Sequence, residues 1–105
     1  MASKGLLIAQ RNRQRQRLLR NLDVIVGTVV ETYLTCGRAG CRCHQGQKHG
    51  PYYLLTWSSG GRTRTRYIPR DKLEEVKRMT RRYQVARDAL YKLGELNRRL
   101  LLEVE

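Results

Sequence analysis

The segment from Cys36 to His49 constrains this chain more than any other part of its sequence. It places three cysteines and a histidine within fourteen residues, in the spacing Cys-x4-Cys-x-Cys-x5-His, with glycines between them. Three thiolates and one imidazole form a complete tetrahedral ligand set for zinc. The sequence therefore predicts a zinc site whose ligands are Cys36, Cys41, Cys43 and His49. His44 is the alternative fourth ligand, and it is less favoured because it directly follows Cys43.

The cysteine count restricts the chemistry of this segment, because three cysteines cannot close a disulfide framework without leaving one thiol over. Three free thiols are the alternative, but a buried free cysteine usually lies singly among apolar residues, and these lie among glycine, arginine and glutamine. Metal binding in a reducing compartment explains the pattern better. A complete ligand set leaves no position for a catalytic water, so we expect a structural site and no enzyme. The alternative is an enzyme that uses Cys41 or Cys43 as a nucleophile, with its pKa lowered by neighbouring arginines.

Charge is the strongest global feature of the 105-residue chain. It holds 22 Lys and Arg residues against 9 Asp and Glu residues, which gives a formal net charge of +13. This balance predicts a polyanion as partner, and we expect nucleic acid, with DNA favoured over RNA. The alternative is a cationic surface that only keeps the protein soluble. No stretch approaches the roughly 20 apolar residues of a membrane span and no secretory signal is evident, so we expect a cytoplasmic protein without a membrane partner.

Residues 1–22 are expected to form an arginine-rich helix that Ser3 caps. Its arginines step mostly by two, so on a helix they surround most of the axis, which an amphipathic core helix would not show. Arginine pairs with phosphates in a bidentate manner, and we therefore expect this helix to contact a nucleic-acid backbone. The residues expected to make these contacts are Arg11, Arg13, Arg15, Arg17 and Arg20. The alternative is a solvated, mobile arm.

Residues 24–68 predict a small antiparallel sheet of about three strands around the metal-binding loop at residues 36–49. Residues 24–34 alternate and are rich in β-branched side chains, and residues 52–57 and 62–68 flank a Ser-Gly-Gly turn that is typical of a hairpin. Spacing of two places three arginines of the last strand on one face, where they can follow a nucleic-acid backbone. The expected contacts are Arg62, Arg64 and Arg66, with Arg38 and Arg42 on the outside of the metal-binding loop.

The length of the hairpin turn leaves two registers open. A three-residue turn pairs Ser58 with Arg62 and keeps the three arginines away from the aromatic and apolar face of the first strand. A two-residue turn shifts the pairing by one residue and places Trp57 directly across from Arg64, as a cation–π pair.

Residues 70–104 predict one long helix. Apolar residues recur there at alternating steps of three and four over four heptads, which is typical of a coiled-coil seam. The expected contacts with a second copy or a partner protein are Val76, Met79, Tyr83, Ala86, Leu90, Leu93, Asn97 and Leu100. The alternative is that this seam packs on the chain's own sheet and first helix. Gly94 leaves open a break into two helices.

Three short motifs carry a resemblance to a known family. They are Cys-Gly-Arg-x-x-Cys-x-Cys from Cys36, His-Gly-Pro-Tyr-Tyr-x-Leu-x-Trp from His49, and Thr-Arg-Tyr-Ile-Pro ending at Pro69. They resemble an uncharacterised family of small basic bacterial and archaeal proteins, over residues 27 to about 100, with the arginine run at residues 11–17 outside the similarity. The resemblance implies the same four metal ligands and no established activity. Some members lie near transposase genes, which implies a DNA-linked role.

Together these features predict a single α+β domain over residues 1–105, with an arginine-rich N-terminal helix, a small antiparallel sheet that bears a zinc knuckle, and a long C-terminal helix. We expect a small zinc-stapled nucleic-acid-binding protein, associated with a mobile element or a larger nucleoprotein complex. The alternative is a coiled-coil interaction or adaptor subunit that does not bind nucleic acid directly.

Overall fold

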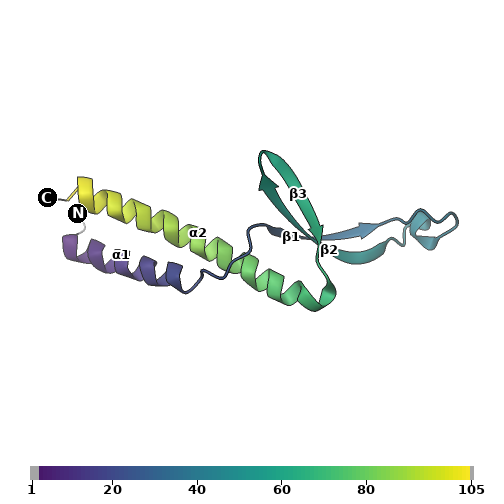
Figure 1. The fold of residues 1–105 in the computed structure, drawn as a ribbon, viewed down its shortest axis with the longest axis horizontal. Helices are drawn as coiled ribbons and strands as arrows, with labels where there is room; N and C mark the ends of the chain where they lie inside the picture. The colour runs from purple at the N-terminus through teal and green to yellow at the C-terminus, as the bar shows by residue number, and fades with distance from the viewer. Residues whose placement is uncertain (1–2, 105) are drawn as a thin grey trace. The chain divides into compact units, whose positions relative to one another are not determined.

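The computed structural model describes residues 3–104, which form two α-helices and a three-stranded antiparallel sheet (Figure 1). The elements are α1 (Lys4–Leu19), β1 (Thr28–Leu34), β2 (His49–Ser59), β3 (Arg62–Tyr67) and α2 (Leu73–Leu102), with short 3-10 helices at Arg42–Gln45 and Arg70–Lys72. This order confirms the predicted α+β class. The chain divides into two compact units. The helical unit consists of the residues up to Ile25 and from Arg81 onward, and the sheet unit consists of residues 26–80.

In the helical unit, α1 carries one buried stripe. The Ser3 hydroxyl accepts a hydrogen bond from the Leu6 amide at 3.1 Å, as the predicted cap requires. Leu7 is only 1% exposed. The half-buried residues that continue its stripe at helical spacing are Arg11, Gln14 and Leu18. The inference that the arginine run excludes a packing face is therefore wrong, because a period of 3.6 leaves one narrow stripe even where arginines alternate in the sequence.

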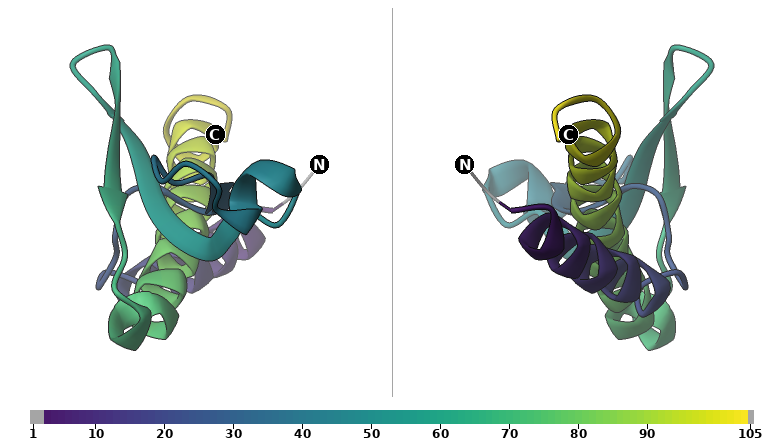
Figure 2. Two further views of the ribbon diagram at one scale, coloured as in Figure 1. Left: turned by 90° about the vertical axis from the view of Figure 1, so that its right-hand side faces the viewer. Right: turned by 90° about the vertical axis from the view of Figure 1, so that its left-hand side faces the viewer.

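The C-terminal part of α2 runs antiparallel to α1 in the helical unit (Figures 1 and 2). The Arg17 guanidinium joins the two helices, because its Nη1 lies 2.7 Å from Asp88 Oδ2. Ala89, the next residue, is completely buried. Half-buried residues further along this face are Leu93, Leu96 and Leu100. Helix α1 of the same chain thus covers this part of α2. This agrees with the alternative prediction, in which α2 packs within its own chain and not on a second one.

The buried face of α2 does not coincide with the predicted seam, because it is turned around the helix axis relative to it. Of the predicted interface residues, Leu90 is 58% exposed and Asn97 is also exposed. The most buried positions of α2, Thr80 and Ala89, lie between seam positions. The other predicted interface residues are half-buried, namely Val76, Met79, Tyr83, Ala86, Leu93 and Leu100. α2 continues through Gly94 without the break that glycine left open.

In the sheet unit, the strands pair in the order β1-β2-β3 and the hairpin adopts the two-residue turn. Trp57 pairs with Arg64. The turn residues Gly60 and Gly61 have φ values of +58° and +77°, and positive φ at both positions is what a type I′ turn requires. The three-residue register is therefore wrong, because two consecutive glycines accept the conformation that matches the twist of the strands. The cation–π contacts between described residues do not include the expected pair of Trp57 and Arg64.

β1 begins at Thr28, later than the predicted strand, because Gly27 turns the chain immediately before it. Gly27 has a φ of +142°, and a Cβ at this position would lie 2.7 Å from the carbonyl oxygen of Thr56. Only glycine fits this combination of conformation and close approach.

The first turns of α2 pack on one face of the sheet. Ile68 is 4% exposed and Thr80 is 7% exposed, and the Lys77 ammonium lies 5.3 Å from the ring centroid of Tyr53. Since alternate residues share a face, the register places Leu55 and the three arginines of β3 on the same side as Tyr53. None of the helices in the described part of the chain has the length and apolar character needed to cross a membrane.

Candidate metal centre and basic surfaces

Two neighbouring strands and a short helix bring the predicted metal ligands together. Cys36 follows β1 and His49 begins β2, and these ends are adjacent because Leu34 pairs with His49. Cys41 is the N-cap of the 3-10 helix between the strands, and Cys43 lies in its first turn. Glycines with φ values of +82° and +101° stand on either side of that helix and allow the chain to reverse.

The four ligand atoms lie within 4.8 Å of one another. The Sγ atoms of Cys36 and Cys43 are 3.5 Å apart. The Sγ of Cys41 lies 3.3 Å from His49 Nε2. A zinc ion with Zn–S bonds of about 2.3 Å holds tetrahedral sulfur ligands about 3.8 Å apart, so both the donor set and the spacing are compatible with one zinc ion. All three cysteines are free thiols and His44 lies outside the cluster, so the structure confirms that the predicted four residues lie close enough to hold a metal.

Burial and hydrogen bonding distinguish the thiols of this cluster. Cys43 is 2% exposed, and its Sγ accepts a hydrogen bond from the Cys36 amide at 3.2 Å. Burial raises the pKa of the Cys43 thiol. The backbone N–H of Cys43 lowers the pKa of the Cys41 thiol to about 6, with further hydrogen bonding from Cys36. A lowered pKa favours the thiolate form of Cys41, which is the form that a metal requires.

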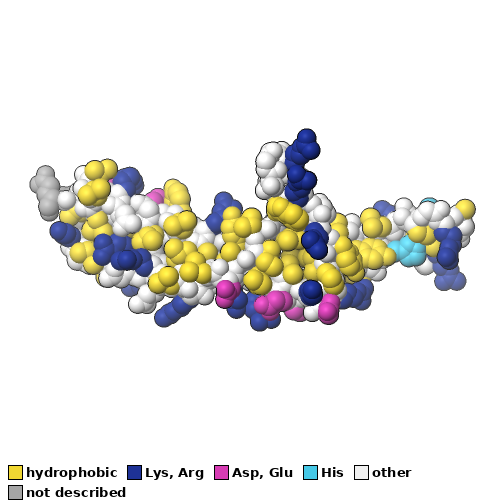
Figure 3. All heavy atoms as spheres, in the orientation of Figure 1, with side chains coloured by type: hydrophobic (Ala, Val, Ile, Leu, Met, Phe, Trp, Pro, Cys, Tyr) yellow, Lys and Arg dark blue, Asp and Glu magenta, His cyan; other side chains and the backbone are white. Residues whose placement is uncertain are grey.

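The arginines predicted to contact phosphate differ in what surrounds them. The exposed ones are Arg13, Arg15 and Arg20 on α1, Arg38 and Arg42 in the metal-binding loop, and Arg62, Arg64 and Arg66 on β3. None of these eight takes part in an ion pair between described residues. Arg17 is paired with Asp88, and Arg11 is half-buried with its Nε buried and without a hydrogen-bond partner. Figure 3 shows Lys and Arg side chains along one side of the β2–β3 hairpin and around the metal-binding loop.

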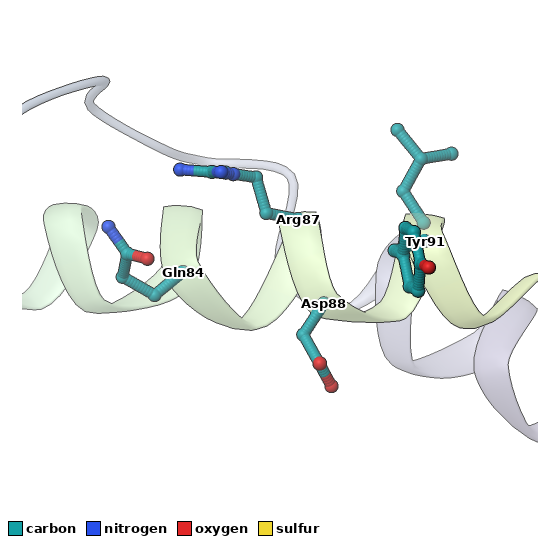
Figure 4. A pocket seen from close by; sticks show the side chains of 5 residues that line it. Gln84, Arg87, Asp88 and Tyr91 are labelled. Carbon is teal, nitrogen blue, oxygen red and sulfur yellow. The ribbon is translucent and has the colours of Figure 1, made fainter.

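The exposed part of the predicted interface on α2 adjoins a hollow of about 590 Å³. Its lining residues are Gln84, Arg87, Asp88, Leu90 and Tyr91, and Figure 4 shows Arg87 and Asp88 pointing to opposite sides of the helix. Tyr91 is 69% exposed and lies outside the predicted seam, because it occupies neither core position of the heptad. Sequence reasoning also missed the pair of Arg17 and Asp88, because the two residues are 71 positions apart and leave no local signal.

Comparison with known families identifies a family for most of this chain. A family described as a domain of unknown function (DUF6788) matches residues 8–78, which is more than half of the chain. The chain belongs to this family. The DUF6788 match includes the arginine run at residues 11–17, so the expectation that this run lies outside the family similarity is wrong. No curated protein and no solved structure matched the chain.

Proposed function

We propose that this member of the DUF6788 family is a small zinc-stabilised protein that binds nucleic acid through exposed arginines. The observation that carries the proposal is that eight exposed arginines, on elements of both units, have no acidic partner among the described residues. Each such guanidinium is available for a bidentate contact with phosphate. The net charge of +13 adds a long-range attraction for a polyanion.

The zinc ion is proposed to have a structural role. Cys36, Cys41, Cys43 and His49 would fill its tetrahedron and tie the end of β1 to the start of β2. With no position left for a reacting water, we propose no catalytic activity for this centre. Metal analysis of protein purified without chelator should give one zinc per chain. A ratio far below one, together with three titratable thiols, would remove the zinc from the proposal.

Nucleic-acid binding is tested by its dependence on salt. We expect fluorescence anisotropy to detect binding of labelled DNA and RNA oligonucleotides at low ionic strength. With six or more phosphate contacts, the affinity should fall about 10³-fold between roughly 50 and 200 mM salt. A protein that binds neither oligonucleotide at the lower salt contradicts the proposal. DNA is the favoured partner, and the ratio of the two affinities decides between DNA and RNA.

The arginines of α1 supply a matched pair of variants for this test. The triple variant R13A/R15A/R20A removes three exposed, unpaired charges, and it should weaken binding and flatten the salt dependence. R78A, R98A and R99A remove three arginines of α2 that are paired with Glu75 or Glu103. This control triple should weaken binding much less. Equal losses would mean that net charge alone, and no particular surface, holds the nucleic acid.

A second candidate function is contact with a second copy of the chain or with a partner protein through α2. The exposure of Leu90 at 58% and Tyr91 at 69% favours it, because both side chains line the same hollow on α2, where side chains of a partner could cover them. Mass measurement should then give a dimer that L90D abolishes, whereas Q84D, on the rim of the same hollow, should leave it intact. A monomer at all concentrations would rule out the homodimer.

A further inference from the structure

The two-residue turn gives the β2–β3 hairpin one face that combines basic and aromatic side chains. From the turn toward the base of the hairpin, this face carries Arg62, then Arg64 beside Trp57, then Arg66 beside Leu55. The opposite face of β3 carries the neutral residues Thr63 and Thr65. Strand geometry of about 3.3 Å per residue sets successive arginines of this row about 6.6 Å apart in a straight line.

A hollow of about 390 Å³ lies where this arginine row ends. Leu55, Ile68 and Val76 supply apolar lining, and Arg66 and Lys72 supply two cations. An apolar floor beside cationic side chains suits a planar, weakly polar group that is joined to a phosphate. Sequence reasoning missed Lys72, although it follows the arginine strand closely along the chain.

The cationic side chains on this face have no acidic partner among the described residues. Neither the three arginines of β3 nor Lys72 takes part in an ion pair between described residues. All four side chains are exposed, and Trp57, the only tryptophan of the chain, is half-buried among them. A half-buried indole beside a guanidinium offers a surface on which a base can stack.

A single strand fits this face better than a duplex does. A duplex keeps its bases stacked inside and offers only its backbone and groove edges to a flat surface. An extended single strand spaces its phosphates comparably to the arginine row and leaves its bases free for an aromatic side chain or an apolar hollow. An acidic peptide could use the cations, but an even row of three matches a regular phosphate backbone more closely.

We infer that this hairpin face binds single-stranded nucleic acid, with phosphates along Arg62, Arg64 and Arg66, a base stacked on Trp57, and a second base in the hollow beside Lys72. The inference rests on the proposed nucleic-acid-binding function and names its substrate class.

The fluorescence of Trp57 tests this inference directly. An oligothymidine of about 15 nucleotides should quench the tryptophan emission of the zinc-loaded protein, because a stacked base quenches indole fluorescence. A mixed duplex of about 15 base pairs should bind at least ~10-fold more weakly and leave the emission largely unchanged. Competition with polyglutamate at matched charge should displace the oligonucleotide only weakly.

Two triple variants of equal charge locate the site. R62A/R64A/R66A should weaken single-strand binding about 100-fold, lower the salt slope by about 2 and remove the preference over duplex. R13A/R15A/R20A on α1 should weaken both probes to a similar degree and keep both the preference and the quenching. Circular dichroism and zinc content establish that the variants are folded. If the hairpin variant is unfolded, K72A takes its place, with an expected three- to fivefold loss for the single strand only.

The outcomes separate the inference from the function on which it rests. Duplex binding as tight as single-strand binding, with unchanged Trp57 emission, overturns the inference and leaves the proposed function in place. Failure to bind either probe at low salt overturns both. Displacement by polyglutamate as efficient as by unlabelled oligonucleotide would identify an acidic peptide as the partner and also overturn the inference.

Discussion

The helix α1 and the strand β3 carry arginines at the same spacing of two residues, and the two elements expose them differently. On α1, the arginines between residues 11 and 17 are wound around the helix, so Arg11 and Arg17 fall on the half-buried face and Arg17 pairs with Asp88. On β3, all three arginines share one face and all are exposed. The period of the secondary structure thus decides which charges pair within the fold and which remain available for a ligand.

This difference separates the arginines that contribute to stability from the arginines that are available for binding. Arg17 joins two helices of the helical unit, whereas the β3 arginines make no ion pair with a described residue. Changes in the hairpin should therefore alter affinity with little effect on folding, and changes on the covered face of α1 should do the reverse. The following variants test this division.

The largest effect should come from removal of the proposed zinc ion, and it should be confined to the sheet unit. All four ligands lie between residues 36 and 49, so chelation should lower the free energy of unfolding of that unit by several kcal/mol. C41S should act in the same direction. Amide hydrogen exchange should show loss of protection in β1 and β2 and retained protection in α1. H44A removes a histidine outside the cluster and should leave zinc content and stability unchanged; equal effects of C41S and H44A would contradict the ligand assignment.

A pair of glycine substitutions should give effects of opposite sign in the two units. A Cβ at Gly60 or at Gly94 would meet no atom within 4 Å, so only the backbone conformation differs. Gly60 has a φ of +58°, and G60A should cost about 1–2 kcal/mol. Gly94 lies within α2, and G94A should stabilise by up to about 1 kcal/mol. Urea unfolding midpoints measure both, and destabilisation by G94A would show that α2 is not a regular helix there.

R17A and R64A should differ in what they change, since the first should lower stability and the second should lower affinity. R17A removes the bridge to Asp88 and should lower the unfolding midpoint slightly while leaving oligonucleotide affinity nearly unchanged, since surface ion pairs contribute little each. R64A should leave the midpoint unchanged and lower affinity about three- to fivefold. The same protein preparations serve for thermal unfolding and for anisotropy. If R64A reduced stability and R17A reduced affinity, the division drawn between the two elements would be wrong.

The smallest expected effect is a pH dependence of the helical unit. The hydrogen bond from Arg17, and then that from Lys92, hold the pKa of Asp88 below its usual value. Because the folded pKa lies below the unfolded one of about 3.9, the pair stabilises the fold above that pH, and this stabilisation is lost as pH falls through the folded value. D88N should therefore be slightly less stable than the natural chain at pH 6 and equal to it near pH 2. A difference that persists at the lower pH would mean that Asp88 acts through packing.

The parts of the fold that follow from local sequence were predictable. The four candidate metal ligands lie within fourteen residues, and the periods of the strands and of α2 are visible in short windows. The buried face of α1 was not, since its stripe mixes Leu7 and Leu18 with Arg11 and Gln14 and is specified by a helix far along the chain. The exposure of Leu90 was not predictable for the same reason, because contacts with distant parts of the chain decide which face of α2 is buried.

The hairpin register depended on a single detail of the turn. Ser59, Gly60 and Gly61 are compatible with a turn of two or of three residues, and only the conformation of the two glycines decides between them. That choice moves the β3 arginines onto the face of Trp57. The composition of the candidate nucleic-acid surface therefore required the structure, although its individual arginines were identified from the sequence.

The salt dependence of single-strand binding tests the central claim most directly. R62A/R64A removes two charges from the hairpin face, and R11A/R17A removes two from the covered face of α1. We predict that the slope of log affinity against log salt falls by about 1.4 for the hairpin pair and stays within error of the natural chain for the α1 pair. Equal falls for the two pairs would contradict the claim that the period of each element decides which arginines bind.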